Sequence, residues 1–201
     1  MEYTKYTKEF WKGSVITSPI PPTMVTCGTV ENPNVFTVAW TGVLNTRPPV
    51  TYISVRPERF SYDLIKKFGE FVINLTTEQL VRAADYCGVK SGRNINKFEE
   101  MNLTAEPASK VNAPILSQSP VNIECKVREV VSLGSHDMFV ADIVAVDVAK
   151  ELLDSNGRLA LEKANLVAYS HGDYFALGKK LGSFGYSVKK KKRKRHKKTP
   201  Q

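Results

Sequence analysis

The sequence predicts a mainly β fold, and the architecture that fits it best is a closed or nearly closed antiparallel barrel with helices at its ends. Three observations favour this class. Runs of β-branched and aromatic residues bounded by turn residues recur along the chain. Few segments have helical spacing, and these are short. Strand-helix-strand units occur at residues 50–75, but the regular alternation of a doubly wound parallel sheet is missing.

Prolines interrupt the first predicted strands. Val15–Ser18 and Met24–Val30 have β-forming compositions and are separated by the prolines at 19, 21 and 22, which cannot donate to a strand ladder. Glu31-Asn32-Pro33-Asn34 supplies turn residues between two β-rich runs. Residues 24–45 are therefore predicted to form a β-hairpin.

The next strand leads into the first helix. Val50–Arg56 is rich in β-branched and aromatic residues, and Tyr62–Phe68 has helical spacing of its apolar residues. Ser61 is the expected N-cap of this helix and Gly69 its expected end. The compact apolar run Phe71–Leu75 is predicted to be a strand.

A second helix is expected to begin at Thr77, a favoured N-cap residue, and to stop at Gly88. Residues 90–120 are polar and contain three prolines that limit helix formation. We therefore expect an irregular segment there.

The C-terminal half holds the strongest strand signals. Ile123–Val131 and Met138–Val148 form a predicted hairpin, joined by the corner Leu133-Gly134-Ser135-His136-Asp137. Asn156-Gly157 marks a further tight turn, which leads into Leu159–Leu161.

The positive charge is concentrated at one end. The formal net charge is +9, from 29 Lys and Arg against 20 Asp and Glu, and residues 189–198 alone hold nine of those basic residues. The remaining chain is formally neutral. We therefore expect a neutral domain over residues 1–188 and a disordered basic tail over residues 189–201.

Several classes of protein are excluded by the absence of their signals. The polar N-terminus lacks the apolar core of a signal peptide, and the uncharged run Gly13–Val30 contains too many prolines for a membrane helix. Cys27, Cys87 and Cys125 form no CxxC pair. We expect free thiols, a cytoplasmic location and no membrane partner.

The familiar motifs of nucleotide and metal chemistry are also missing. Gly172–Lys180 resembles a phosphate loop, but its glycines are one residue too far apart and its second lysine stands where Ser or Thr is needed. No GxGxxG follows a strand, and no GxSxG elbow is present. Three scattered histidines do not indicate a metal site.

Two clusters of basic and hydroxyl residues are suited to a phosphate. Guanidinium groups, hydroxyls and a close backbone approach at glycine can converge on a dianion, where charge-assisted hydrogen bonds are strong. The simpler interpretation is a set of solvated strand and loop ends. The two clusters are Ser54, Arg56, Arg59 and Ser61, and Ser91, Gly92 and Arg93 followed by Lys97.

A flat ligand is suggested by a different stretch. Thr37-Val38-Ala39-Trp40 is either an ordinary core strand or a strand whose small residues beside an aromatic leave room for a planar ring. His136 lies at the predicted hairpin corner, where a lone histidine is more often solvated or structural than functional.

Five motifs together resemble the flavin reductase family, and most closely its flavoredoxin-like branch. The resemblance covers residues 10–188, and the motifs follow the family's order. They are Asn34–Trp40, Ser54–Ser61, Gly69–Leu75, Ser91-Gly92-Arg93 with Lys97, and Gly134–Val140.

The resemblance implies a split β-barrel of Greek-key type that binds FMN and acts as a homodimer, with the cofactor near the subunit interface. It places His136 near the nicotinamide or flavin edge, although many members read Gly-Asp-His where this chain has Gly134-Ser135-His136-Asp137. It implies that Thr37, Val38, Ala39 and Trp40 line the isoalloxazine ring. It implies that the ribityl chain and phosphate are held by Ser54, Arg56, Arg59, Ser61, Ser91, Gly92 and Lys97.

The leading functional hypothesis is an FMN-dependent oxidoreductase that moves electrons between NAD(P)H or a redox protein and flavin, using the chemistry of the cofactor itself. A second hypothesis is a protein that binds nucleic acid or another anionic surface through the tail at 189–198. A third is a barrel that binds flavin, or another flat ligand such as haem, without turnover.

Overall fold

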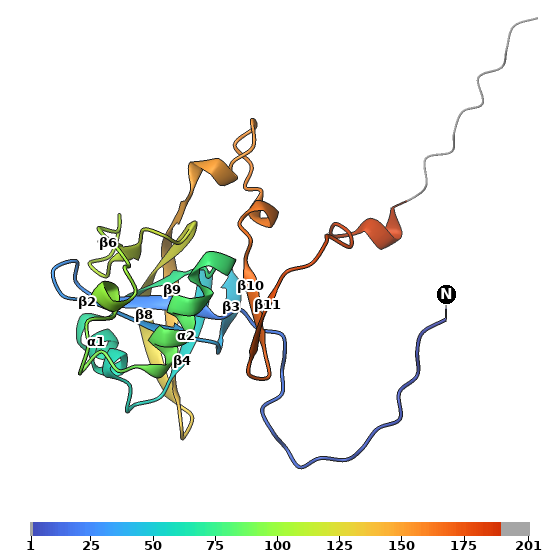
Figure 1. The fold of residues 1–201 in the computed structure, drawn as a ribbon, viewed down its shortest axis with the longest axis horizontal. Coiled ribbons are helices and arrows are strands. Elements are labelled where there is room, and N and C mark those ends of the chain that lie inside the picture. Colours follow the sequence, from blue (N-terminus) through green and yellow to red (C-terminus); the bar gives the residue numbers. More distant parts are fainter. Residues whose placement is uncertain (1, 190–201) are drawn as a thin grey trace, which may run out of the picture.

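The computed structural model describes residues 2–189 as a curled β-sheet with short helices packed around it (Figure 1). Seven strands form one antiparallel sheet in the order β2-β1-β5-β8-β9-β4-β3. The mainly β class is thereby confirmed. The strands are β1 Thr23–Gly28, β2 Pro33–Val38, β3 Thr41–Thr46, β4 Pro49–Val55, β5 Glu70–Asn74, β8 Val121–Ser132 and β9 Asp137–Val148.

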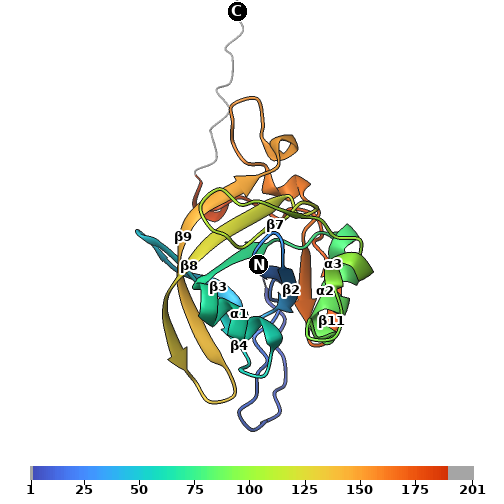
Figure 2. The same cartoon turned by 90° about the vertical axis from the view of Figure 1, so that its left-hand side faces the viewer.

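The sheet curls into a barrel that stays open along one side (Figure 2). β2 and β3 are its two edge strands, yet only Ala39 and Trp40 separate them in the chain. The predicted hairpin over residues 24–45 is therefore β1 and β2 alone, because β3 leaves β1 to pair with β4. At the split, Ser54 N donates to Trp40 O at 2.9 Å.

Helix α1, Phe60–Phe68, follows the predicted course but begins earlier. Its N-cap is Arg59, and Ser61 is instead a buried residue of the first turn. Gly69 ends the helix in the left-handed conformation at φ 68°, which glycine adopts without a steric penalty.

Helix α2, Val81–Val89, is preceded by a 3-10 turn at Glu78–Leu80, and Thr77 makes no capping bond with its side chain. The prediction that Gly88 stops this helix is wrong, because Gly88 lies inside it. A Cβ added there would lie 3.3 Å from Thr37 Cβ. Gly88 therefore permits close packing of α2 on β2.

The segment 90–120 is largely irregular, as expected, but it contains three short elements. They are helix α3, Lys97–Glu100, and the paired strands β6, Ala105–Glu106, and β7, Ile115–Leu116. The buried Glu124 of β8 anchors the loop between β6 and β7, because its carboxylate accepts hydrogen bonds from Ser109 and from the backbone N–H groups of Lys110 and Val111.

The predicted hairpin of β8 and β9 is confirmed, with paired residues from Val121 and Val148 to Ser132 and Asp137. A further hairpin was not predicted: β10, Val167–Ser170, pairs with β11, Asp173–Ala176. His171 at φ 51° and Gly172 at φ 104° form its turn. After the segment Asn156-Gly157, Leu159 forms an isolated bridge with Leu153 and Leu161 begins a 3-10 turn.

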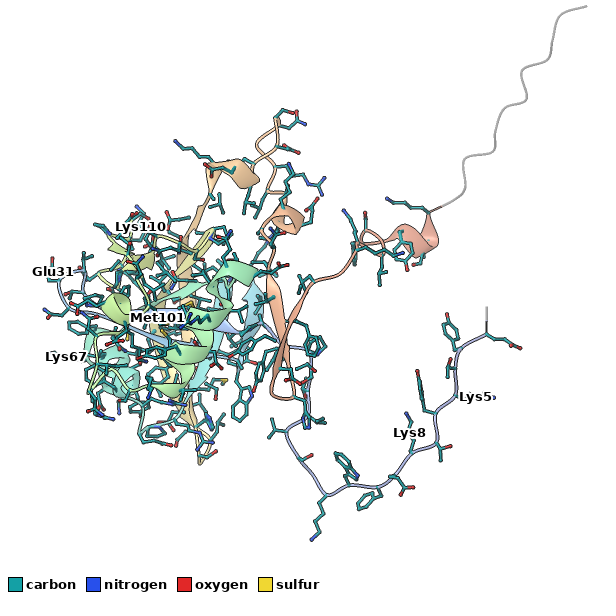
Figure 3. The ribbon with its side chains drawn as sticks, in the orientation of Figure 1. Lys5, Lys8, Glu31, Lys67, Met101 and Lys110 are labelled. Atoms are coloured by element: carbon teal, nitrogen blue, oxygen red, sulfur yellow. The ribbon has the colours of Figure 1, made fainter. Side chains whose placement is uncertain are left out.

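Both ends of the described chain run away from the barrel (Figure 1). The predicted strand Val15–Ser18 is wrong: this segment pairs with nothing in the described structure and is exposed, and the prolines at 19, 21 and 22 that follow it prevent a continuous ladder. Figure 3 shows Lys5 and Lys8 on this arm, well away from the body.

Besides the 3-10 turn that precedes α2, the described residues form three others, at Lys150–Leu152, Leu161–Lys163 and Tyr186–Val188.

The core lies inside the curl of the sheet. Its main cluster joins apolar residues of β1, β2, β4, β5, β8 and β9 to Ile65 of α1, with Phe71 and Phe139 fully buried. A second cluster packs α2 and α3 against Met24 and Val35. Within residues 2–189, every helix is too short or too polar to cross a membrane.

Candidate functional site

A pocket of about 430 Å³ opens where the end of β4, the start of α1 and the segment between α2 and α3 meet. We call it the basic pocket, because five of its lining residues are Arg or Lys. Six of the residues predicted to hold a phosphate and ribityl chain line this pocket. The full lining is Phe36, Arg56, Glu58, Arg59, Phe60, Ser61, Lys90, Ser91, Gly92, Arg93 and Lys97.

Lys97 is the buried cation of this pocket. The residue is only 4% exposed, and its Nζ donates to Val35 O at 2.8 Å and to Cys87 O at 2.9 Å. Burial lowers the pKa of Lys97, and the nearby thiols partly oppose this effect. An ammonium has three donors, so one N–H remains for a ligand after both carbonyls are satisfied.

The two arginines that follow β4 reach the pocket from its exposed side. Arg56 Nη1 lies 3.5 Å from the Glu58 carboxylate, and both side chains are largely exposed. Arg59 Nη1 donates to Gly88 O at 2.9 Å, which ties it to the end of α2. Each guanidinium has further N–H donors beyond these contacts, so both remain able to bind an anion.

Ser61 and Gly92 are brought together by Asn34. The Asn34 amide donates to Ser61 Oγ at 2.7 Å, and both residues are buried. A Cβ at Gly92 would overlap the Asn34 side chain and crowd Phe60. Glycine is therefore needed at position 92 for the loop to lie against β2 and expose its backbone to the pocket.

The side chains at the end of β2 are already engaged within the fold. The Thr37 hydroxyl donates to Ala84 O on α2, and the Val38 side chain is 4% exposed within the core. Neither side chain is free for a ring, and the carbonyl oxygen of Val38 already accepts a hydrogen bond from the Thr23 hydroxyl at 3.1 Å. Ala39 and Trp40 follow at the split of the barrel, where Trp40 is 38% exposed.

Trp40 and His136 form an aromatic pair across the split. Their ring centroids lie 4.4 Å apart at an interplanar angle of 45°. Burial, followed by the charge of Arg56, lowers the pKa of His136, and Arg59 adds to this effect while Glu58 opposes it. The imidazole is therefore neutral at pH 7. Both arginines also line the basic pocket.

Ser54 is not brought into the basic pocket. It pairs with Met138 on β9, and its backbone N–H is used at the split of the barrel. Its role is that of a strand residue in this structure.

Sequence reasoning missed four lining residues as site members, namely Phe36, Glu58, Phe60 and Lys90, whereas Arg93 was already named in the second phosphate cluster. Arg93 donates to Glu58 O at 2.8 Å and to the Asp63 carboxylate at 3.3 Å, and its guanidinium lies 5.7 Å from the centre of the Phe60 ring. Lys90 and Arg93 flank Ser91-Gly92 in the sequence. The position of Lys90 beside this glycine turn, opposite Arg93, is the signal that could have identified it.

The model of the family described as the flavin reductase like domain matches residues 17–178. An uncharacterized protein of Archaeoglobus fulgidus is 35% identical over 117 residues, which are 58% of this chain and 66% of that protein. The chain thus spans just under two thirds of that relative's length.

Two solved structures have the same fold. The flavoredoxin of Desulfovibrio vulgaris (Miyazaki F) superposes with a TM-score of 0.84 at 28% identity, over 91% of this chain and all of that one. An FMN-binding protein from Thermus thermophilus superposes with a TM-score of 0.73 at 24% identity, over 90% and 99% of the two chains. The split-barrel prediction is confirmed by these neighbours. The family match covers most of the chain, and the chain belongs to the flavin reductase like domain family.

Proposed function

We propose that this protein is an FMN-dependent oxidoreductase of the flavoredoxin and flavin reductase type, moving electrons between NAD(P)H or a redox protein and flavin. The observation that carries the proposal is the basic pocket, in which Arg56, Arg59 and Lys97 meet buried Ser61 beside the split of the barrel. Membership of the family supports a flavin-related oxidoreductase.

The residues present fit the phosphate end of FMN. A phosphate dianion needs several charge-assisted donors, and the pocket offers guanidinium groups, the remaining N–H of Lys97 and hydroxyls at Ser61 and Ser91. Gly92 lets the main chain approach closely. The proposed phosphate and ribityl ligands are thus Arg56, Arg59, Ser61, Ser91, Gly92 and Lys97, whereas Ser54, which the sequence placed among them, lies outside the basic pocket.

The ring would lie along the end of β2. Thr37, Val38 and Ala39 would line it there, and Trp40 with neutral His136 would supply an aromatic wall. When bound, FMN supplies the hydride and electron chemistry. The chain's part is to orient the ring and exclude water from one side. His136 is the proposed residue at the nicotinamide or flavin edge, where its neutral ring can accept or donate one hydrogen bond.

The first experiment compares FMN with riboflavin, which lacks the phosphate. Arg56→Gln should weaken FMN binding by about tenfold to a hundredfold, because a hydrogen bond to a charged group contributes about 1.5–3 kcal/mol. Riboflavin binding should change little. Arg82→Gln is the matched control, since Arg82 is an exposed arginine of α2 outside the basic pocket. Equal losses for both ligands would reject the phosphate assignment.

The electron donor is tested on the FMN-loaded protein without oxygen. Loss of the flavin absorption on adding NADH or NADPH identifies a reductase. Loss only with a reduced redox protein identifies an electron carrier of the flavoredoxin type. An FMN-loaded protein that accepts electrons from neither would contradict the oxidoreductase proposal and favour flavin binding without turnover.

A homodimer and a cytoplasmic location belong to the same proposal. The three cysteines are free and buried, which suits a reducing compartment. The alternative of nucleic-acid binding rests on residues 189–198, of which only Lys189 lies within the described residues. The comparisons give that alternative no support.

A further inference from the structure

Two acidic side chains lie together on the long hairpin of β8 and β9, and the function proposed above does not use them. Glu124 of β8 pairs with Ala145 of β9, and Asp147 stands two residues further along β9. Because successive residues of a strand point to opposite faces, Glu124 and Asp147 are diagonal neighbours on the same face of the sheet. Glu124 is fully buried and Asp147 is partly buried. We call these two residues the carboxyl pair.

The two carboxyls have very different surroundings. The Glu124 carboxylate accepts hydrogen bonds from Ser109 N at 2.9 Å and Ser109 Oγ at 2.7 Å. It also accepts from Lys110 N at 2.6 Å and from Val111 N at 3.1 Å. Asp147 Oδ2, in contrast, is buried and has no hydrogen-bond partner within residues 2–189. Hydrogen-bond donors favour the ionised form of a carboxyl, whereas burial without donors favours the protonated form.

Neighbouring carboxyls that are withdrawn from water do not readily carry a negative charge on both members. Burial raises the pKa of Asp147, and the contact with the Glu124 carboxylate adds to this effect. Burial would also raise the pKa of Glu124, but the hydrogen bonds that it accepts from Ser109 and Lys110 outweigh burial and lower it. The proton of the carboxyl pair therefore belongs to Asp147.

The donors to Glu124 all come from the loop between β6 and β7. Val111 and Ala113 of this loop pack against the fully buried Val72 of β5. At the end of the loop, Pro114 O accepts a hydrogen bond from the Thr26 hydroxyl of β1. The carboxyl pair therefore lies beneath a loop that covers part of the apolar core.

The other charged groups around the carboxyl pair are paired or exposed. Glu70 of β5 accepts a hydrogen bond from Asn112 N at 2.7 Å, and it lies 3.6 Å from Lys126 Nζ. The side chains of Lys110 and of Lys150-Glu151 are exposed, where water and salt screen their charges. Among the described residues, no ion pair joins either carboxyl of the pair to a basic side chain. A charge that develops on Asp147 is therefore left to act on Glu124.

We propose that the carboxyl pair is a pH-sensitive switch, in which protonated Asp147 keeps the loop between β6 and β7 closed and loss of its proton releases the loop. Protonated Asp147 is neutral, and its O–H can donate to Glu124. Ionised Asp147 repels Glu124, and this repulsion is relieved when the Glu124 carboxylate leaves its donors in the loop and becomes hydrated. Flavin binding plays no part in this switch.

The direction of the pH dependence follows from the raised pKa of Asp147. The closed loop holds a proton that the open loop releases above the usual aspartate value of 3.8. The stability that this proton gives to the closed loop is therefore complete below 3.8 and is lost as the pH rises through the raised pKa of Asp147.

The first test locates the proton. Carbon-13 NMR follows the side-chain carboxyl of Asp147 in the full chain from about pH 3 to about pH 9, with its signal assigned by comparison with Asp147→Asn. The signal should titrate clearly above 3.8. An Asp147 carboxyl that titrates at or below this value would overturn the inference, and this result does not depend on the folding of any variant.

The second test measures the loop itself. Hydrogen exchange at the backbone amides of Lys110 and Val111, corrected for the pH dependence of the chemical exchange rate, reports how often the loop opens. In the wild type, protection should fall by up to about tenfold for each pH unit between 3.8 and the raised pKa of Asp147, and then level off. The reason is that closing the loop takes up one proton in this range.

Asp147→Asn removes the charge, keeps the size of the side chain and retains a donor for Glu124. Protection at the same two amides should then no longer fall with rising pH. Asp173→Asn is the matched control and should keep the wild-type pH dependence, since Asp173 is exposed on β11, far along the chain from the loop. Circular dichroism verifies that both variants are folded. A pH dependence that survives in Asp147→Asn, or that is missing from the wild type, would show that this proton does not control the loop.

Discussion

At the scale of single residues, Lys97 shows how one side chain can serve both the fold and the site. The sequence suggested a point charge on a phosphate. The structure places its ammonium between a carbonyl of β2 and a carbonyl of α2, and also in the wall of the basic pocket. Because burial lowers the pKa of Lys97, its ammonium loses its proton at a lower pH than that of a surface lysine.

Lys97→Met should lower the free energy of unfolding by about 2–4 kcal/mol, because it leaves two buried carbonyls without their donor. Urea denaturation measures this change. Lys90→Met is the control, since Lys90 is an exposed cation of the same pocket and should change stability by less than about 0.5 kcal/mol. Equal stability of the two variants would mean that Lys97 is not a structural donor.

At the scale of elements, one hydrogen bond joins the two segments that carry the site. Tyr62 in α1 donates to the Asp137 carboxylate at the start of β9, at 2.6 Å. Tyr62 also meets the Phe139 ring edge-on, with centroids 5.3 Å apart. Arg59 and Ser61 precede Tyr62, and His136 precedes Asp137. This contact therefore fixes the basic pocket relative to the aromatic pair.

The contribution of this contact to the stability of the folded state should disappear in acid. The hydrogen bond from Tyr62 leads the interactions that lower the pKa of Asp137 below its usual 3.8. A carboxyl whose pKa is lower in the folded state stabilises above its usual pKa, and the effect is lost as the pH falls through the lowered value. Asp137→Asn should thus lower the thermal midpoint at pH 7 and have little effect well below pH 3.8.

Thermal unfolding followed by circular dichroism from pH 7 down into the acid range would measure the difference. Tyr62→Phe removes the same bond and serves as the partner variant. If the difference in thermal midpoint between wild type and Asp137→Asn stays constant from pH 7 into the acid range, the stability gained from this contact does not depend on an ionised carboxylate.

At the scale of the whole molecule, the open side of the barrel and the two extended arms present much apolar surface. Phe10 is 93% exposed, Trp11 72% and Leu181 86%, and all three lie outside the seven-stranded sheet. Large exposed apolar groups often mark an interaction surface. A second copy of the chain is the partner expected from the sequence, and the arms are the segments that would reach it.

Removing residues 2–16 should therefore weaken self-association. We expect the full chain to sediment as a dimer and the shortened chain to sediment as a monomer at the same concentration. The reason is that the shortened chain lacks the apolar side chains of the arm, which would be buried against the second copy in the dimer. Removing residues 190–201 is the control and should leave the dimer intact. A full chain that sediments as a monomer, or a shortened one that remains a dimer, would reject this role.

Local rules predicted much of the chain. Turn residues between β-branched runs located β1, β2, β8 and β9, and Gly69 located the end of α1. The rules failed where packing overrides propensity. Gly88 lies within a helix because α2 packs tightly on Thr37. The segment Val15–Ser18 remains outside the sheet despite its β-forming residues.

The sequence by itself determined the class of fold, the separation of a neutral body from a basic terminal run, and the residue types suited to a phosphate. Only the tertiary structure decided which of them meet. Arg56 and Ser61 come from one stretch of the chain and Gly92 and Lys97 from a later one, and packing between β2, α1 and α3 brings the two stretches to one pocket. Ser54 was excluded by the same packing. Periodicity reports which face of an element is buried, but contacts between distant segments depend on how the whole sheet curls.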